Sequence, residues 1–93
     1  MTYIKVYWKH TFPDEPILMF SELDEKRNEI RKIEVYRHNL IGCAWGDISR
    51  NGTFLSKYEI SEINVINEDA QFEGIEIERE EFEEVWEKAI NIK

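Results

Sequence analysis

The chain has 93 residues, of which 42% are hydrophobic, 13% aromatic and 34% charged. This length predicts a single domain over residues 1–93, and the aromatic content is too high for a disordered chain. The one cysteine, Cys43, excludes an intrachain disulfide and with it the class of small secreted proteins that disulfides hold together. Lysines interrupt the first nine residues, which excludes a signal peptide or membrane span there. We therefore expect a cytoplasmic protein with no membrane partner.

The charge is divided unevenly along the chain. Residues 1–50 carry 8 Lys/Arg and 8 Asp/Glu, whereas residues 51–93 carry 4 Lys/Arg and 12 Asp/Glu. The whole formal net charge of −8 therefore lies in the second half. Because such a region repels a polyanion at long range, the distribution predicts no nucleic-acid partner and favours a basic protein.

The first half reads as four strands joined by short turns. Alternating or continuous apolar residues predict strands over 3–10, 17–23, 29–37 and 41–45. The segments between them are rich in Pro, Asp and Asn, as turns are. Short connections between consecutive strands predict an antiparallel meander.

A register follows if apolar residues are placed opposite one another on one inner face. This rule pairs Trp8 with Leu18, Phe20 with Ile33, and Ile33 with Trp45. The inner face then consists of nine residues: Ile4, Val6, Trp8, Leu18, Phe20, Ile33, Val35, Cys43 and Trp45.

The clearest element of the second half is a C-terminal helix over Arg79–Ile90. Its apolar residues follow helical spacing and form one stripe: Phe82, Val85, Trp86, Ala89 and Ile90. We expect this stripe to cover the inner sheet face, with Trp86 buried against it. Residues 49–53 are expected to form a loop, a short helix follows Ser61, and residues 73–77 are extended. The fold class is therefore α+β, a four-stranded antiparallel meander packed by a C-terminal amphipathic helix, with a short middle helix.

The same register places Glu22, Arg31 and Asp47 side by side at one end of the inner face. Two carboxylates around a guanidinium form either a structural ion ladder or a pair for acid–base chemistry, as in glycoside cleavage. The arginine favours the ladder, because it lowers the carboxyl pKa values and a general acid needs a raised pKa.

His10 ends the row that begins with Ile4, beside the turn over residues 12–16. Either it acts as a general base or ligand, or its ring nitrogens are bonded within that turn. An alternative function for the protein is therefore small-molecule binding or a minor enzymatic activity in a pocket near His10, Glu22, Arg31 and Asp47. No nucleophile is spaced around His10, so the sequence assembles no catalytic set.

The sequence predicts neither a metal nor a cofactor. Cys43 and the two histidines lack the spacing of metal ligands, and the acidic runs lack the pattern of a calcium loop. The four glycines fit no nucleotide-binding pattern.

Four glutamates of the C-terminal helix lie off its apolar stripe: Glu80, Glu83, Glu84 and Glu87. They form either a solvated helix face or an acidic surface that docks on a basic protein partner.

Several short motifs resemble those of one known family. They are Tyr3-Ile-Lys-Val-x-Trp-x-His10, Ser21-Glu-Leu-Asp24, Glu29-x-Arg-Lys-x-Glu34, Gly52-Thr-x-Leu55 and Glu80-Glu-Phe-Glu-x-x-Trp86. Together they resemble the small bacterial proteins grouped as domain of unknown function 6881, over nearly the whole chain. The resemblance implies no established activity. The small size and lack of catalytic motifs are similar to those of immunity proteins in toxin systems, which is an analogy. Our leading functional hypothesis is therefore an immunity protein that binds and blocks a bacterial toxin, such as a nuclease.

Overall fold

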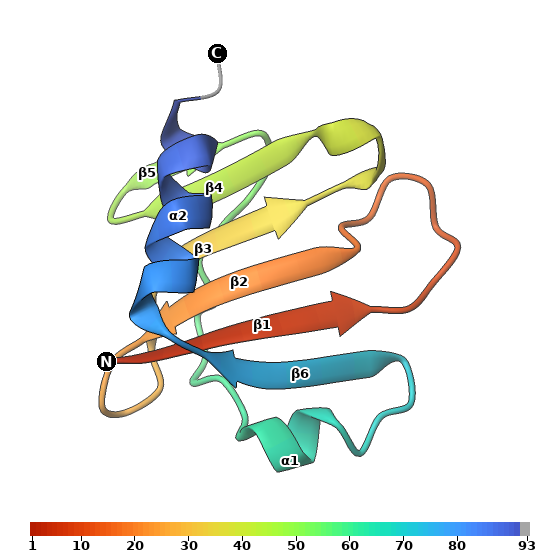
Figure 1. The fold of residues 1–93 in the computed structure, drawn as a ribbon, viewed down its shortest axis with the longest axis vertical. Coiled ribbons are helices and arrows are strands. Elements are labelled where there is room, and N and C mark those ends of the chain that lie inside the picture. The colour runs from red at the N-terminus through yellow and green to blue at the C-terminus, as the bar shows by residue number, and fades with distance from the viewer. Residues whose placement is uncertain (92–93) are drawn as a thin grey trace.

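The computed structural model describes residues 1–91, which form an antiparallel six-stranded sheet with helices on both faces (Figure 1). The strand order in the sheet is β5-β4-β3-β2-β1-β6. The strands are β1 (Thr2–Trp8), β2 (Leu18–Leu23), β3 (Glu29–Val35), β4 (Ile41–Trp45), β5 (Ile48–Arg50) and β6 (Phe72–Ile77). The helices are α1 (Ile63–Ile66) and α2 (Arg79–Ile90), and Arg37–Asn39 forms a 3₁₀ turn. The α+β class and the C-terminal helix are confirmed, but the sheet has six strands rather than four.

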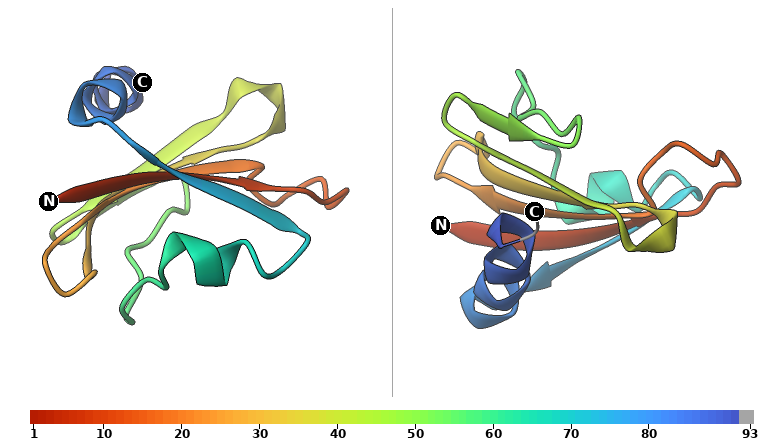
Figure 2. Two further views of the ribbon diagram at one scale, coloured as in Figure 1. Left: turned by 60° about the horizontal axis from the view of Figure 1, so that its bottom comes forward. Right: turned by 90° about the horizontal axis from the view of Figure 1, so that it is seen from above.

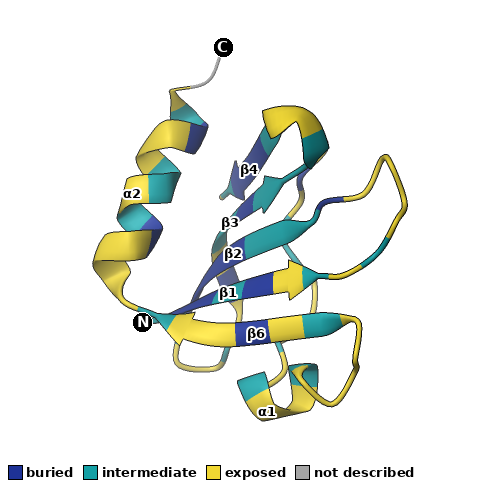
Figure 3. Cartoon of the chain, turned by 45° about the vertical axis from the view of Figure 1, so that its right-hand side comes forward, coloured by how far each residue is buried: buried dark blue, intermediate teal, exposed yellow. Residues whose placement is uncertain are grey.

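Helix α2 crosses one face of the sheet, hereafter the helix face, as predicted. Figure 2 shows α2 and α1 on opposite sides of the twisted sheet. The bounds of α2 are the predicted ones, and its buried residues are Phe82 and Ala89. Both pack in a core with Phe20, Ile33 and Cys43 of the strands. Figure 3 shows that much of the rest of α2 is exposed. Trp86 is only partly buried, with its ring 5.2 Å from that of Trp45, so Phe82 is the deeper anchor.

The other side of the sheet, hereafter the opposite face, carries a second core. Ile4, Val6 and Leu23 are buried there against Ile60, Ile63, Ile66 and Phe72. The predicted register of the first hairpin is therefore wrong by one residue, since Leu18 pairs with Tyr7 rather than with Trp8. A one-residue shift moves every side chain of β1 to the other face. Because both faces are covered, the alternation within β1 did not decide which face it lines, and the long Pro-containing loop imposed no register.

The third hairpin keeps its predicted faces, but its register differs by two residues. Ile33 pairs with Cys43 rather than with Trp45. The reason is the place of the turn, which is centred one residue earlier than predicted: it covers Arg37–Asn39, and Leu40 O accepts a hydrogen bond from Tyr36 N. His38 and Asn39 both have positive φ (70° and 64°), as residues of a tight hairpin turn do. Moving the centre of a hairpin turn by one residue shifts the pairing of its strands by two.

The two strands that the sequence did not identify as part of the sheet are its edges. β5 has only three residues, all exposed. β6 covers the predicted extended segment and pairs antiparallel with β1. Asn67, just after α1, bonds through its side-chain amide to both the N–H and the C=O of Gly74 in β6. These two hydrogen bonds satisfy the backbone N–H and C=O of Gly74, which would otherwise face solvent at the edge of the sheet.

Replacement of Phe82 by alanine tests the packing of α2. Phe82 is 0% exposed, so Phe82→Ala should lower the free energy of unfolding by about 3–5 kcal/mol. Phe54→Ala is the matched control, because Phe54 is 68% exposed and its loss should change stability by less than about 0.5 kcal/mol. Urea denaturation followed by tryptophan fluorescence measures both. Equal effects of the two substitutions would contradict the packing described here.

Candidate functional site

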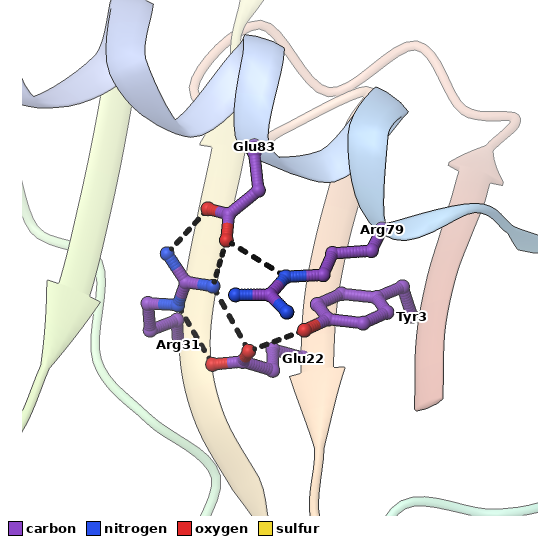
Figure 4. A network of polar contacts seen from close by, with 5 residues as sticks. All are labelled: Tyr3, Glu22, Arg31, Arg79 and Glu83. Atoms are coloured by element: carbon purple, nitrogen blue, oxygen red, sulfur yellow. Dashed lines mark hydrogen bonds and ion pairs between the residues drawn. The ribbon is translucent and has the colours of Figure 1, made fainter. Parts of the chain in front are cut away.

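A cluster of charged side chains lies between α2 and the sheet, centred on Arg31 of β3 (Figure 4). Arg31 donates to both oxygens of Glu22, from Nε to Oε1 at 2.7 Å and from Nη2 to Oε2 at 2.9 Å. It also donates to both oxygens of Glu83, from Nη1 at 2.8 Å and from Nη2 at 3.1 Å. The planar guanidinium thus joins β2, β3 and α2 through two bidentate pairs.

Tyr3 and Arg79 complete this group, hereafter the Arg31 cluster. The hydroxyl of Tyr3 donates to Glu22 Oε2 at 2.8 Å, and Nε of Arg79 lies 3.4 Å from Glu83 Oε2. Arg31 Cζ also lies 4.8 Å from the ring centroid of Phe82 and 5.0 Å from that of Trp86. The cation is therefore held by carboxylates in its plane and by aromatic rings of α2.

The electrostatics of the Arg31 cluster favour a structural role. Hydrogen bonds from Arg31 hold the pKa of Glu22 below its ordinary value, although burial opposes the shift. Hydrogen bonds from Arg31 are also the main cause that lowers the pKa of Glu83. The pKa of Arg31 itself is raised, chiefly by its hydrogen bonds to Glu22. Burial and the bond to Glu22 raise the pKa of Tyr3. Carboxylates held in the ionised form are poor general acids, so the interpretation as an ion ladder fits better than acid–base chemistry.

Asp47 does not take part in this cluster. The expected contact with Arg31 required Arg31 to lie opposite Asp47, but the observed register pairs Arg31 with Trp45. Asp47 is instead exposed in the turn between β4 and β5. Glu83 of α2 takes the place that the sequence had given to Asp47.

His10 lies beyond the far end of β1, seven residues from Tyr3, which pairs with Glu22. At ~3.3 Å per residue this is about 23 Å, so the structure does not bring His10 together with Glu22 and Arg31. His10 Nδ1 accepts from Phe12 N at 2.9 Å, which makes Nε2 the protonated nitrogen that donates to Pro16 O at 2.8 Å. Both nitrogens are therefore used within the turn, as one of the two interpretations expected.

The glutamates of α2 fall into two groups. Glu83 belongs to the Arg31 cluster, and Glu81 lies 3.2 Å from Lys5 Nζ. Glu80, Glu84 and Glu87 are exposed and have no ion pair among the described residues. Glu76 near the end of β6 and Glu78 just before α2 are also exposed and line one surface hollow together with Arg79. The five exposed glutamates from β6 to the end of α2 are hereafter the acidic edge: Glu76, Glu78, Glu80, Glu84 and Glu87.

A second polar group, on the opposite face, was missed at the sequence level. Glu29 Oε2 accepts from Ser21 Oγ at 2.6 Å, and Oε1 accepts from Ser56 N at 2.8 Å. Lys32 Nζ lies 3.8 Å from Glu29 Oε1. A register shift pairs Leu23 with Glu29 instead of Ile30, which turns Glu29 onto the face of Ser21 and Lys32. No residue type marks this irregularity, so the sequence carried no signal for the group.

Two further properties concern the described residues. Within residues 1–91, no group of three or more His, Cys, Asp or Glu side chains is arranged to hold a metal ion. In the same part of the chain, neither helix has the length and apolar character needed to cross a membrane.

Replacement of Arg31 by methionine tests the Arg31 cluster through its pH dependence. Arg31→Met leaves Glu22 and Glu83 without their cation and should lower the free energy of unfolding by about 3 kcal/mol at about pH 7. Since both carboxyl pKa values are lowered in the folded wild type, the stabilisation is present above the ordinary glutamate pKa and is lost as the pH falls through the folded values. The difference between wild type and variant should therefore be smaller at about pH 3 than at about pH 7.

The matched control is Arg79→Met, because Arg79 contacts Glu83 only at 3.4 Å and its side chain is 69% exposed. We expect it to change stability by no more than about 1 kcal/mol. Urea denaturation at the two pH values measures both variants. A loss for Arg31→Met that is the same at both would argue against a charge-based role.

Comparison with known proteins identifies a family for this chain, but it finds no curated protein and no solved structure that match it. A family model described as Domain of unknown function (DUF6881) matches residues 2–91. This match covers nearly the whole chain, including both cores and the Arg31 cluster, and the chain therefore belongs to the DUF6881 family.

Proposed function

We propose that this chain is a cytoplasmic protein-binding module whose acidic edge docks on a basic protein. In its most concrete form it is an immunity protein that blocks a bacterial toxin, such as a nuclease. The observation that carries the proposal is the acidic edge itself, five exposed glutamates along β6 and α2 that have no ion pair among the described residues.

The distribution of ion pairs supports this choice of surface. Basic residues of the first half neutralise four acids of the second: Lys5 with Glu81, Lys9 with Glu73, Arg27 with Glu62, and Arg31 with Glu83. The acidic edge remains outside these pairs, and Lys88 in the last turn of α2 adds one positive charge to it. Unpaired charge on a rigid helix and its neighbouring strand is available to an external partner without breaking an internal contact.

The mechanism would be electrostatic. A nuclease binds its substrate through a basic cleft, and a row of carboxylates complements such a cleft and excludes the phosphates from it. Long-range attraction between the two surfaces would also raise the association rate. The partly buried Arg31 cluster would help to hold α2, and hence the glutamates along it, in place on the sheet.

Charge reversal at the acidic edge tests the proposal. The variant carries Glu80→Lys, Glu84→Lys and Glu87→Lys and spares Glu83, whose loss would disturb the Arg31 cluster. After capture of a basic partner from cells of the source organism, the association rate of this variant should fall at least about tenfold, with a smaller change in dissociation. Association of the unmodified protein should slow steeply with added salt, since charges are screened over ~10 Å at ~0.1 M.

The matched control carries Asp14→Lys, Glu15→Lys and Glu25→Lys, three exposed acids in the loops after β1 and β2. It has the same net charge as the first variant, so any difference between the two reports position and not total charge. Circular dichroism checks that both remain folded. If both variants slow association equally, or if binding ignores salt, the acidic edge is not the docking surface.

A further inference from the structure

A cavity of about 320 Å³ lies on the opposite face of the sheet, beneath the segment that contains α1. Its walls are mainly apolar and come from both layers: Ile4, Val6, Met19, Ile60, Ile66 and Phe72. This volume is at the lower end of the range of small-molecule sites. With a liquid-water share of ~30 Å³ per molecule, it has room for a ligand of roughly ten non-hydrogen atoms.

One end of the cavity is polar. Ser21, Glu29 and Lys32 line it from β2 and β3. The Glu29 side chain is 1% exposed, and its two oxygens already accept from Ser21 Oγ and Ser56 N. The proton of Ser21 is therefore engaged, while the lone pairs of its hydroxyl oxygen remain available as acceptors.

Lys32 supplies the donors at this end. Its ammonium lies 3.8 Å from Glu29 Oε1 and 3.7 Å from Glu34 Oε2, which are ion-pair distances longer than a hydrogen bond. Among the described residues it makes no hydrogen bond, and its side chain is 19% exposed. Three N–H donors thus remain unused at the polar end of an apolar cavity.

The charges around the cavity select against an ionic ligand. Glu29, Glu34 and Lys32 together carry one net negative charge, and Asp69 adds another at the wall. A carboxylate ligand would meet two fixed carboxylates, whereas an ammonium would meet the Lys32 cation and find both Glu29 oxygens occupied. A neutral oxygen can accept from Lys32 without either cost, and a hydroxyl can also donate to Ser21 Oγ.

We propose that this cavity binds a small uncharged molecule with an apolar body and a carbonyl or hydroxyl oxygen that accepts from Lys32. The site lies on the other side of the sheet from α2, and no glutamate of the acidic edge lines it, so it is independent of docking through that edge. It also differs from the expected pocket near His10, Glu22 and Arg31, none of which lines it.

The first test compares probes of one shape and different charge: benzyl alcohol, benzoate and benzylamine. Each is titrated into the full chain labelled at its Ile and Met methyl groups, and NMR shifts are followed. Benzyl alcohol should cause saturable shifts at Ile4, Met19 and Ile66 and leave the methyl groups of Ile48 and Ile75 unchanged. Both charged probes should bind at least about tenfold more weakly. Absence of saturable shifts, or a charged probe that binds as tightly, would overturn the proposal.

The second test blocks the cavity. Val65 lines it and is 47% exposed, so Val65→Trp can be accommodated at the rim and should reduce benzyl alcohol binding at least about tenfold. The matched control is Ile75→Trp, because Ile75 is also 47% exposed but pairs with Lys5 on the helix face. It should leave binding unchanged. Equal effects of the two substitutions would place the binding elsewhere.

The third test isolates the ammonium. Lys32→Met keeps the apolar stem and removes the donors, so the affinity for benzyl alcohol should fall about fivefold relative to the affinity for toluene, which lacks the oxygen. Equal changes for both probes would refute the role of Lys32. Should this variant fail to fold, the probe series and the Val65→Trp comparison still decide the proposal.

Discussion

The double ion pair of Arg31, which lies partly buried beneath α2, is the interaction on which the arrangement of this domain depends. The guanidinium binds a carboxylate from β2 and another from α2, and it contacts the Phe82 and Trp86 rings of the helix. A cation removed from water in this way must be matched by both carboxylates, because an unpaired charge there would be strongly destabilising. The cluster therefore ties α2 to β2 and β3 on the helix face, beside the apolar packing of Phe82 and Ala89. It accounts for a paired set of charges without requiring that they perform chemistry.

The sheet is covered on both faces, and this divides the polar groups of the protein into separate environments. On the helix face, the Arg31 cluster is closed, since each carboxylate oxygen accepts from at least one donor. On the opposite face, the Glu29 carboxylate is also satisfied, but Lys32 keeps its donors beside an apolar cavity. The first environment is suited to holding two layers together. The second has the combination of apolar walls and a few directed polar groups that small-molecule sites share.

The folded structure shows which charged residues of the two halves of the chain form ion pairs. Strand β6 pairs with β1 at one edge of the sheet and brings Glu73 to Lys9, whereas α2 brings Glu81 to Lys5 and Glu83 to Arg31. These pairs neutralise part of the excess negative charge, and the unpaired acids include the five glutamates of the acidic edge. We propose two independent binding surfaces, the acidic edge for a macromolecular partner and the cavity on the opposite face for a small neutral molecule. The family to which the chain belongs has no assigned activity, so both rest on the physical argument.

The sequence by itself determined the elements with strong periodic patterns. The apolar stripe of α2 gave its bounds, and the pairing of Phe20 with Ile33 was correct because β2 and β3 have a short polar turn between them. The sequence also showed where the net charge lies and that Arg31 would be paired with Glu22. These features depend on neighbouring residues or on a single face of one element, so local patterns are sufficient to specify them.

Only the tertiary structure decided which face each strand lines and which distant residues meet. β1 carries apolar or aromatic side chains on both of its faces, so its pattern is compatible with two registers, and the choice depends on what covers each face. Glu83 replaces Asp47 beside Arg31 because the crossing position of α2 is set by packing between layers. The cavity arises from a one-residue register shift at Glu29 and from the placement of residues 60–69 above β1 and β2. Such features result from contacts between segments far apart in the chain, which no local pattern encodes.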